Sequence, residues 1–265
     1  MWDIMVNVGR ATEAEPAVRC GVAMARRHGA FLTGLQIVPV NPVFLGTADA
    51  IGLLALEEGE AESRQLWWEA LCRRHEVAGA WEVLRGMYEL TLAKRSLLAD
   101  VMVSPLPVGV PEAPTVAAEL TRVLFSGSSP MLLVPEAWHR GFDFRRVAVG
   151  WNGSAEALRA IHAALPLLRG ADEVLVYDGD RADLPGGRPS LPIQGWLTRH
   201  GVKLRWVHFD PEQDVGPALH DEALAQHAEL LVMGAWGRSR MSELMLGGAT
   251  RWLLGNTRLP LFLAH

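Results

Sequence analysis

Short apolar runs alternate with longer amphipathic stretches along the chain. Residues 4–9 form one apolar run, residues 13–28 follow with apolar positions at helical spacing, and residues 32–38 form a second apolar run. Runs of this length, bounded by polar residues, predict buried strands, whereas the intervening spacing predicts a helix. Strands that alternate with helices are typical of parallel βαβ units. The pattern therefore predicts an α/β protein built on parallel sheets.

The same order of elements occurs again in the second half of the chain. An apolar run at residues 147–152 is followed by a helical stretch at 155–168 and by another apolar run at 173–177. Gly9 then corresponds to Gly150, at an offset of 141 residues. One set of elements that occurs twice in a sequence predicts a duplicated domain.

The offset between the two copies shrinks along the chain, because residues 99–103 match residues 228–232 at an offset of only 129. The first half therefore carries about 12 extra residues, which fall between Asn41 and Val77. A short polar segment at 136–145 separates the last strand of the first half from the first strand of the second. We expect an N-terminal domain over residues 1–136 and a C-terminal domain over residues 145–265.

Composition and charge narrow the function classes. The chain has 25 Lys and Arg against 30 Asp and Glu, a net charge of −5, and no basic block, which argues against nucleic acid as a partner. Only two cysteines occur, Cys20 and Cys72, so a disulfide framework is excluded and a reducing compartment fits best. The sequence has no apolar run of about 18 residues and no signal-peptide pattern. We therefore expect a cytoplasmic protein that does not enter membranes.

A glycine-rich segment in the second half carries the most specific signal. The strand predicted at residues 230–233 runs into Gly234 and Gly237, and nine residues later Gly247 and Gly248 open a helix. Glycine lets a backbone approach a ligand closely, and a helix N-terminus offers free N–H groups and a positive dipole end. The segment therefore predicts a site for an anionic ligand.

This segment resembles the ATP-binding signature G-x2-G-x9-G-[S/T] of the universal stress proteins. The resemblance extends over both halves and to the last strand, which contains Pro260 as it usually does in that family. It implies two Rossmann-like halves, each with a five-stranded parallel sheet in the order 3-2-1-4-5. It also implies ATP, with or without Mg²⁺, across the ends of strands one and four. The protein would then be a stress-response module that binds ATP or another adenine nucleotide.

The resemblance implies a set of nucleotide-binding residues in the C-terminal half. They are Asn152, Gly153, Ser154, Tyr177, Met233, Gly234, Gly237, Arg238, Gly247, Gly248, Ala249 and Thr250. Two of them depart from the family pattern, because Asn152 stands where an aspartate is usual and Gly248 stands where a hydroxyl residue is usual. Both changes weaken the expected contacts with ATP, since an amide is a poorer metal ligand and one hydroxyl contact to phosphate is lost.

The first half lacks the corresponding residues. An offset of 129 sets Pro105, Val108, Ala118 and Glu119 against the four glycines, and Ala11 falls opposite Asn152 at the offset of 141. Proline donates no N–H, and a glutamate would repel a phosphate. We therefore expect no nucleotide of this kind in the N-terminal half.

Several alternatives stay open at this point. The glycines could serve tight turns alone, Trp236 could fill the pocket of a ligand-free scaffold for protein partners, or the same loop could support a slow ATPase. No catalytic or metal-ligating set is expected, and His220 and His227 suit a helix face better than a zinc site. The strand at 131–134 could pair with the strand at 261–263, which would make a pseudo-dimer within the chain and leave room for a homodimer.

Overall fold

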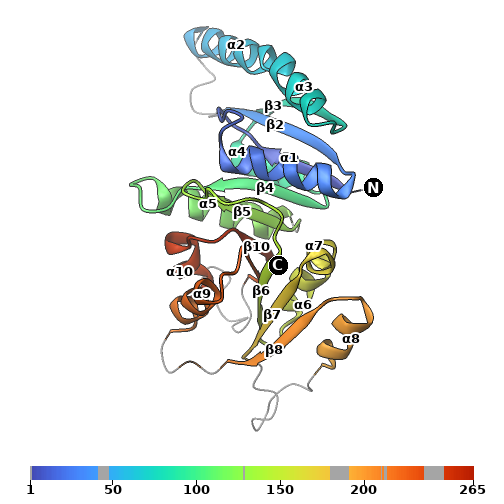
Figure 1. Ribbon diagram of the computed structural model, residues 1–265. Coiled ribbons are helices and arrows are strands. Elements are labelled where there is room, and N and C mark those ends of the chain that lie inside the picture. Colours follow the sequence, from blue (N-terminus) through green and yellow to red (C-terminus); the bar gives the residue numbers. More distant parts are fainter. Residues whose placement is uncertain are drawn as a thin grey trace. The chain divides into compact units, whose positions relative to one another are not determined.

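The computed structural model describes residues 2–40, 48–127, 129–179, 191–209, 211, 214–235 and 248–265. The chain divides into two compact units (Figure 1). One unit comprises Met1–Pro105 and Ala118–Ser129, and the other comprises Leu106–Ala117 and Pro130–His265. The division expected at residues 136–145 stays a prediction.

The first unit contains four parallel strands in the order β3-β2-β1-β4. The strands are β1 (Asp3–Asn7), β2 (Phe31–Pro39), β3 (Gly79–Gly86) and β4 (Val101–Leu106). Its helices are α1 (Pro16–His28), α2 (Ala48–Ser63), α3 (Gln65–Arg74) and α4 (Tyr88–Ser96), and α5 (Ala113–Gly127) is divided between the units. The extra residues of the first half thus fall in the connection from β2 to β3, which contains α2 and α3.

The second unit contains five parallel strands in the order β10-β9-β6-β7-β8. They are β6 (Arg146–Trp151), β7 (Glu173–Asp178), β8 (Leu204–His208), β9 (Leu230–Gly234) and β10 (Leu261–Ala264). The helices are α6 (Ala155–Ala163), α7 (Leu165–Gly170), α8 (Ile193–Arg199), α9 (Val215–Ala225) and α10 (Gly248–Asn256). In the numbering of this half the strand order is 3-2-1-4-5, which confirms the expected α/β class and its topology.

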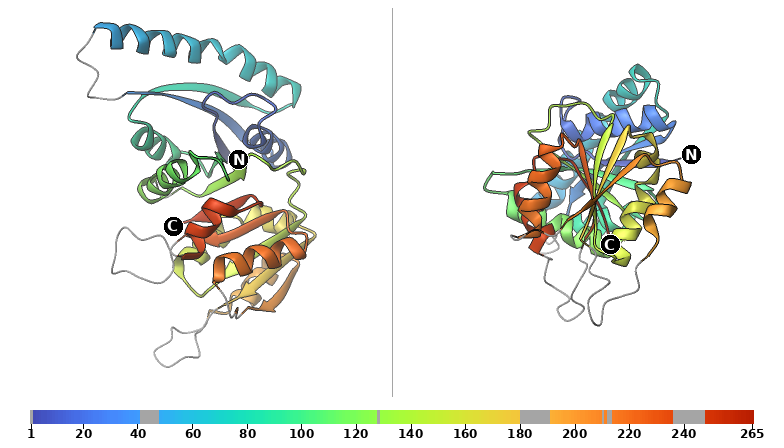
Figure 2. Two further views of the ribbon diagram at one scale, coloured as in Figure 1. Left: turned by 90° about the vertical axis from the view of Figure 1, so that its left-hand side faces the viewer. Right: turned by 60° about the horizontal axis from the view of Figure 1, so that its bottom comes forward.

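The sheet of the second unit is covered on both faces. The helices α6, α7 and α8 lie on one face, and α9 and α10 lie on the other (Figure 2). The central strands therefore have no solvent-facing side, and Val147, Ala148 and Val149 of β6 are fully buried. This double burial explains why the predicted strands appear in the sequence as continuous apolar runs rather than as alternating patterns.

The strand β5 (Met131–Pro135) completes the second unit rather than the first by spatial contact. It pairs with β10 in antiparallel orientation, with Leu133 opposite Leu261 and Met131 opposite Leu263. The pairing predicted between these two segments is therefore confirmed. It covers the backbone edge that β10 would otherwise expose to solvent.

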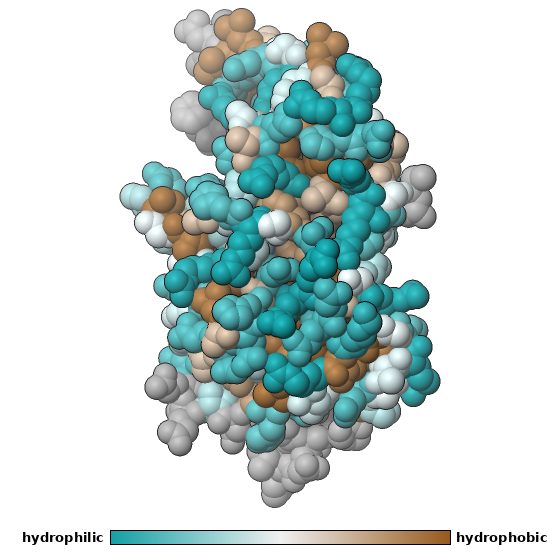
Figure 3. Space-filling view, viewed as in Figure 1, coloured by the Kyte–Doolittle hydropathy of each residue, from teal (hydrophilic) through white to brown (hydrophobic). Residues whose placement is uncertain are grey.

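The helix α2 carries both an acidic run and exposed apolar side chains. The acidic run at residues 57–62 lies within this helix. Glu57 forms an ion pair with Arg10, and Glu58 forms one with Arg85. Its apolar residues Ile51, Leu53 and Leu56 are exposed, and brown side chains are visible over this helix at the top of Figure 3. Among the helices that the structure describes, none is both long and apolar enough to cross a membrane.

Candidate functional site

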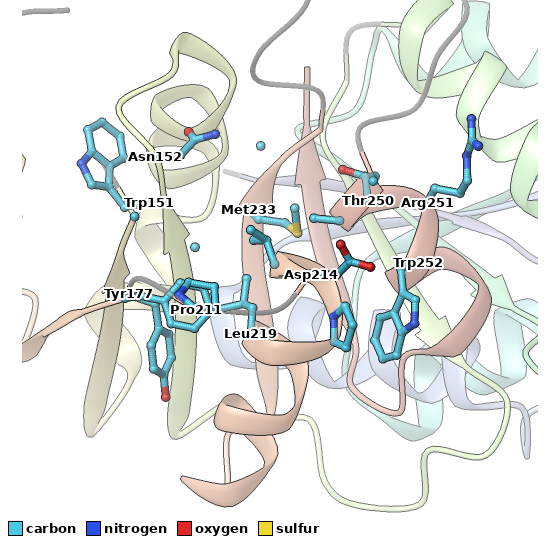
Figure 4. A pocket seen from close by; sticks show the side chains of 18 of the residues that line it. Trp151, Asn152, Tyr177, Pro211, Asp214, Leu219, Met233, Thr250, Arg251 and Trp252 are labelled. Carbon is cyan, nitrogen blue, oxygen red and sulfur yellow. The ribbon is translucent and has the colours of Figure 1, made fainter. Parts of the chain in front are cut away.

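A cavity of about 840 Å³ lies in the second unit, at the carboxyl ends of β6, β7 and β9 (Figure 4). The neighbouring strands β6 and β9 mark the point where the strand order reverses, since the chain moves outward from β6 through β7 to β8 and then returns to β9. Open α/β sheets bind their ligands at this position. Seven of the predicted site residues line the cavity: Asn152, Tyr177, Met233, Gly234, Gly248, Ala249 and Thr250.

The loop after β6 is shaped by its own side chains. The Oδ1 atom of Asn152 accepts a hydrogen bond from the Ser154 amide at 3.1 Å, and Gly153 has a φ of 71°, which favours glycine. The Ser154 hydroxyl accepts a bond from the Ala157 amide at 3.1 Å and so caps α6. Gly153 and Ser154 were predicted as ligand contacts, but neither is among the described residues that line the cavity. Asn152 lines it and retains its Nδ2 donors.

Tyr177 forms an aromatic wall rather than a polar contact. Its ring lies edge-on to Phe209, with the ring centroids 5.8 Å apart, and both residues line the cavity. The Tyr177 hydroxyl points away from Asn152 and Met233 in Figure 4 and is buried without a hydrogen-bond partner among the described residues. Burial, with a smaller effect of Glu222, raises the pKa of Tyr177 to about 12. Only 1% of Tyr177 is exposed, so it contributes to this wall through its packing with Phe209 and offers a ligand no ionised oxygen.

The end of β9 packs tightly against the start of α6. A Cβ on Gly234 would lie 2.3 Å from the backbone nitrogen of Ala157 and 2.5 Å from the backbone carbon of Glu156. Real Cβ contacts are not this short, so only glycine fits at position 234 without a backbone shift. The first glycine of the predicted signature thus has a structural role in addition to its place in the cavity wall.

Two helix N-termini border the cavity. Gly248, Ala249 and Thr250 form the first turn of α10, and Gly216 of α9 approaches α10 so closely that a Cβ on it would lie 3.0 Å from the Ala249 Cα. The first backbone N–H groups of a helix lack partners within the helix, and the aligned peptide dipoles add positive potential there. The cavity therefore combines an aromatic and apolar end, near β6 and β7, with an end that favours negative charge.

The charges in the described lining are balanced rather than basic. Asp214, the N-cap residue of α9, lines the cavity without making a side-chain capping bond. Its carboxylate points into the space between Met233 and Trp252 in Figure 4, whereas Arg251 extends away from it. A carboxylate at a helix N-terminus is stabilised by the dipole, but it also repels a phosphate placed in the same cavity.

His220 lies on the helix α9, as predicted, and its side chain contacts neighbouring residues. Its Nε2 atom accepts a hydrogen bond from the Arg258 amide at 3.1 Å, and its Nδ1–H donates to Asp221 at 3.0 Å. The ring also lies edge-on to Trp252, with centroids 5.3 Å apart. His220 therefore fixes α9 against the end of α10. Within the described part of the chain, no three His, Cys, Asp or Glu residues are grouped so as to hold a metal ion.

Four residues that figure in the sequence analysis lie outside the described residues: Trp236, Gly237, Arg238 and Gly247. Conversely, the sequence analysis did not assign Phe209, Asp214 or Leu219 to the site, although all three line the cavity. A signal was present, because Pro217 follows Asp214 at the start of a helical stretch after the third strand of this half. The strand-to-helix loop before α9 was the place to search.

Several solved structures resemble this chain in fold. The doubled α/β arrangement is matched along its whole length by a universal stress protein from Archaeoglobus fulgidus DSM 4304. The match covers 99% of this chain and 96% of that protein, with 14% identity and a TM-score of 0.70. A putative universal stress protein from Pseudomonas aeruginosa UCBPP-PA14 matches over 100% of this chain and 93% of its own, with 13% identity and a TM-score of 0.62.

A functionally unknown protein from Pseudomonas aeruginosa PAO1 matches in the same way, with 13% identity, a TM-score of 0.59, and 100% and 92% of the two chains covered. Neither the protein-family models nor the curated protein sequences gave a match. The chain therefore has the universal stress protein fold along its whole length.

Proposed function

We propose that the second half of the chain binds an adenine nucleotide in the cavity between β6, β9 and the helices α9 and α10. One observation carries the proposal: the cavity joins an aromatic and apolar wall, which includes Tyr177 and Phe209, to the N-terminus of α10. A purine ring suits the first surface, and the free N–H groups of Gly248 and Ala249 suit a phosphate. ATP, ADP and AMP share this chemistry.

The proposed role is that of a ligand-controlled binding module in a stress response, acting in the cytoplasm. Both cysteines, Cys20 and Cys72, are buried free thiols, which agrees with a reducing compartment. Asp214 is the carboxylate that the described lining offers to a Mg²⁺ ion accompanying ATP. Titrations are therefore best made both with and without Mg²⁺.

The experiment combines mass spectrometry with calorimetry. Ligand released from the purified protein by denaturation is identified by mass, and the apo protein is then titrated with ATP, ADP, AMP and adenosine. We expect one site per chain. Failure to find either co-purified nucleotide or a heat of binding with any of the four compounds would overturn the proposal and favour a scaffold for protein partners.

A matched pair of variants ties binding to α10. Gly248→Asp places a carboxylate at the helix N-terminus in the cavity, and Gly255→Asp adds the same charge near the other end of the helix, outside the lining. A Cβ at either position meets none of the described residues within 4 Å, so we expect both variants to fold. Loss of nucleotide binding in Gly248→Asp but not in Gly255→Asp supports the site. Equal binding by both variants rejects it.

A further inference from the structure

In the first unit, the side chain of Arg64 occupies the position that corresponds to the cavity of the second unit. Arg64 lies between α2 and α3, and its guanidinium donates hydrogen bonds to the backbone carbonyls of Gly9 and Ala11. It also donates to Oε1 of Gln36, at 2.7 Å. Gly9 and Ala11 follow β1, and Gln36 belongs to β2, so the charged group sits at the carboxyl ends of these two strands.

Strand pairing shows which positions of the two halves correspond. In the first unit Val6 pairs with Val103, and in the second Val149 pairs with Val232. If β4 is aligned with β9 at the offset of 129, the next position of β1, Asn7, corresponds to Gly150. Gly9 therefore corresponds to Asn152. The sequence alignment had placed Ala11 opposite Asn152, and the strand register corrects it by two residues, because the loop after β1 is longer than the loop after β6.

The correspondence extends to the neighbouring strands. In the first unit Val6 also pairs with Gly34 of β2, and in the second Val149 also pairs with Val176 of β7. Two positions after Gly34 comes Gln36, which therefore corresponds to Asp178. Arg64 thus binds the counterparts of Asn152 and Asp178, at the end of the sheet where the second unit has its cavity.

Side chains also fill the position closer to the sheet. Where the second unit has Gly150, the first has Asn7, whose Nδ2 donates to the Tyr88 hydroxyl at 2.8 Å and to the Ser104 hydroxyl at 3.0 Å. Burial raises the pKa of Tyr88, so the phenol remains a neutral member of this network. Ser104 corresponds to Met233 at the offset of 129. The first unit therefore fills with its own polar groups the space that the second leaves to its cavity.

The surroundings of Arg64 suit a planar cation. Its guanidinium carbon lies 4.9 Å from the ring centroid of Trp67 and 5.3 Å from that of Trp81, both within the range of a cation–π contact. Two carbonyl oxygens and one amide oxygen accept its N–H groups. A rigid fork of donors between aromatic faces is a guanidinium geometry that an ammonium group cannot reproduce.

We propose that Arg64 is a built-in ligand of the first half. It occupies a guanidinium-binding site made by Gly9, Ala11, Gln36, Trp67 and Trp81, and it holds the α2–α3 segment over the carboxyl ends of β1 and β2. The segment that supplies it lies in the connection from β2 to β3, which is longer than the connection from β7 to β8. The first half is thereby closed to external ligands by its own side chain, and the inference does not depend on which ligand the second half takes.

Chemical rescue tests the proposal. Arg64→Ala in the full chain should lower the melting temperature by about 5 °C, because a partly buried set of charged hydrogen bonds is lost. Methylguanidinium chloride at millimolar concentrations should restore part of this loss in a saturable way. Methylammonium chloride, at the same ionic strength, should not. Wild-type protein should show no saturable response to methylguanidinium, since Arg64 already fills the site.

A control variant separates the site from a general salt effect. Arg73→Ala removes the same charge from an exposed side chain that pairs with Glu69 at 3.9 Å, and it should show no rescue. A folded Arg64→Ala protein that methylguanidinium does not stabilise, or rescue of equal size in Arg73→Ala, would overturn the proposal. If Arg64→Ala does not fold, Arg64→Lys decides, because a melting temperature equal to that of the wild type would contradict planar recognition.

Discussion

Gly234 and Ala157 stand in direct backbone contact, since a Cβ on Gly234 would approach the Ala157 nitrogen to 2.3 Å. This contact joins the end of β9 to the first turn of α6. The opening glycine of a sequence pattern that suggests phosphate binding is therefore required by the packing of the sheet against a helix. A glycine at this position alone is no sign of a ligand, and the case for one rests on the cavity and on α10.

Gly234→Ala should destabilise the second unit by about 2–3 kcal/mol, because the added methyl group forces the backbones of β9 and α6 apart. Urea unfolding followed by circular dichroism measures the change. Gly248→Ala serves as the control, since a Cβ there meets no atom of the described part of the chain within 4 Å and alanine favours the helix. The control should unfold at the same urea concentration as the wild type or slightly above it.

In the absence of Mg²⁺, Asp214→Asn should strengthen the binding of ATP about fivefold while leaving the binding of adenosine almost unchanged. The substitution removes about 1 kcal/mol of repulsion between a carboxylate and a phosphate at an exposed site. Asparagine is as good an N-cap as aspartate, so α9 should persist. Calorimetric titration of both variants with both compounds gives the comparison. Equal effects on ATP and adenosine would show that Asp214 acts on the sugar or base instead.

Gly248→Ser should strengthen nucleotide binding by about 0.5–1.5 kcal/mol, the contribution of one additional hydrogen bond. The described residues leave room for the side chain at position 248, and the new hydroxyl would lie at the N-terminus of α10 beside the phosphate. The affinities of wild type and variant for ATP are compared at one salt concentration. A weaker or unchanged affinity would mean that the phosphate does not lie at this turn.

Tyr177→Phe should raise the free energy of unfolding by up to about 1 kcal/mol. The Tyr177 hydroxyl is buried without a hydrogen-bond partner among the described residues, so its removal relieves a desolvation cost. Because the ring is retained, nucleotide affinity should not change. A loss of affinity in thermally stable Tyr177→Phe protein would show that the hydroxyl turns into the cavity when ligand binds.

The two tyrosines also predict the response to alkaline pH. The pKa of Tyr177 is raised to about 12 and that of Tyr88 is raised as well, in both cases chiefly by burial. The folded protein therefore keeps phenol protons that the unfolded chain loses near pH 10, and stability falls as pH rises from about 10 toward 12. Absorbance at 295 nm should rise only together with unfolding. A reversible rise near pH 10 in folded protein would contradict this burial.

Much of the fold can be predicted from the sequence, because apolar runs such as residues 147–151 are uninterrupted. The duplication helps as well, since the elements predicted in one half can be checked against those of the other. The resemblance to the universal stress proteins leads to Asn152 and Tyr177, since both residues stand at the ends of strands that the sequence predicts. Asp214 is harder to assign, because the sequence indicates the strand-to-helix loop before α9 but not the packing of α9 on α10 at Gly216 that brings the residue to the site. The role of Arg64 is not predictable for a similar reason, since the residues that accept its hydrogen bonds lie 28 to 55 residues away in the chain.

The pairing of β10 with both β5 and β9 has a consequence for folding. Residues Leu261–Ala264 form a strand that has a partner on each side. Until β10 is in place, β5 and β9 each lack this partner along one backbone edge, and such edges invite association with other chains. Correct assembly of this part of the sheet therefore depends on a strand that lies far from β5 in the sequence.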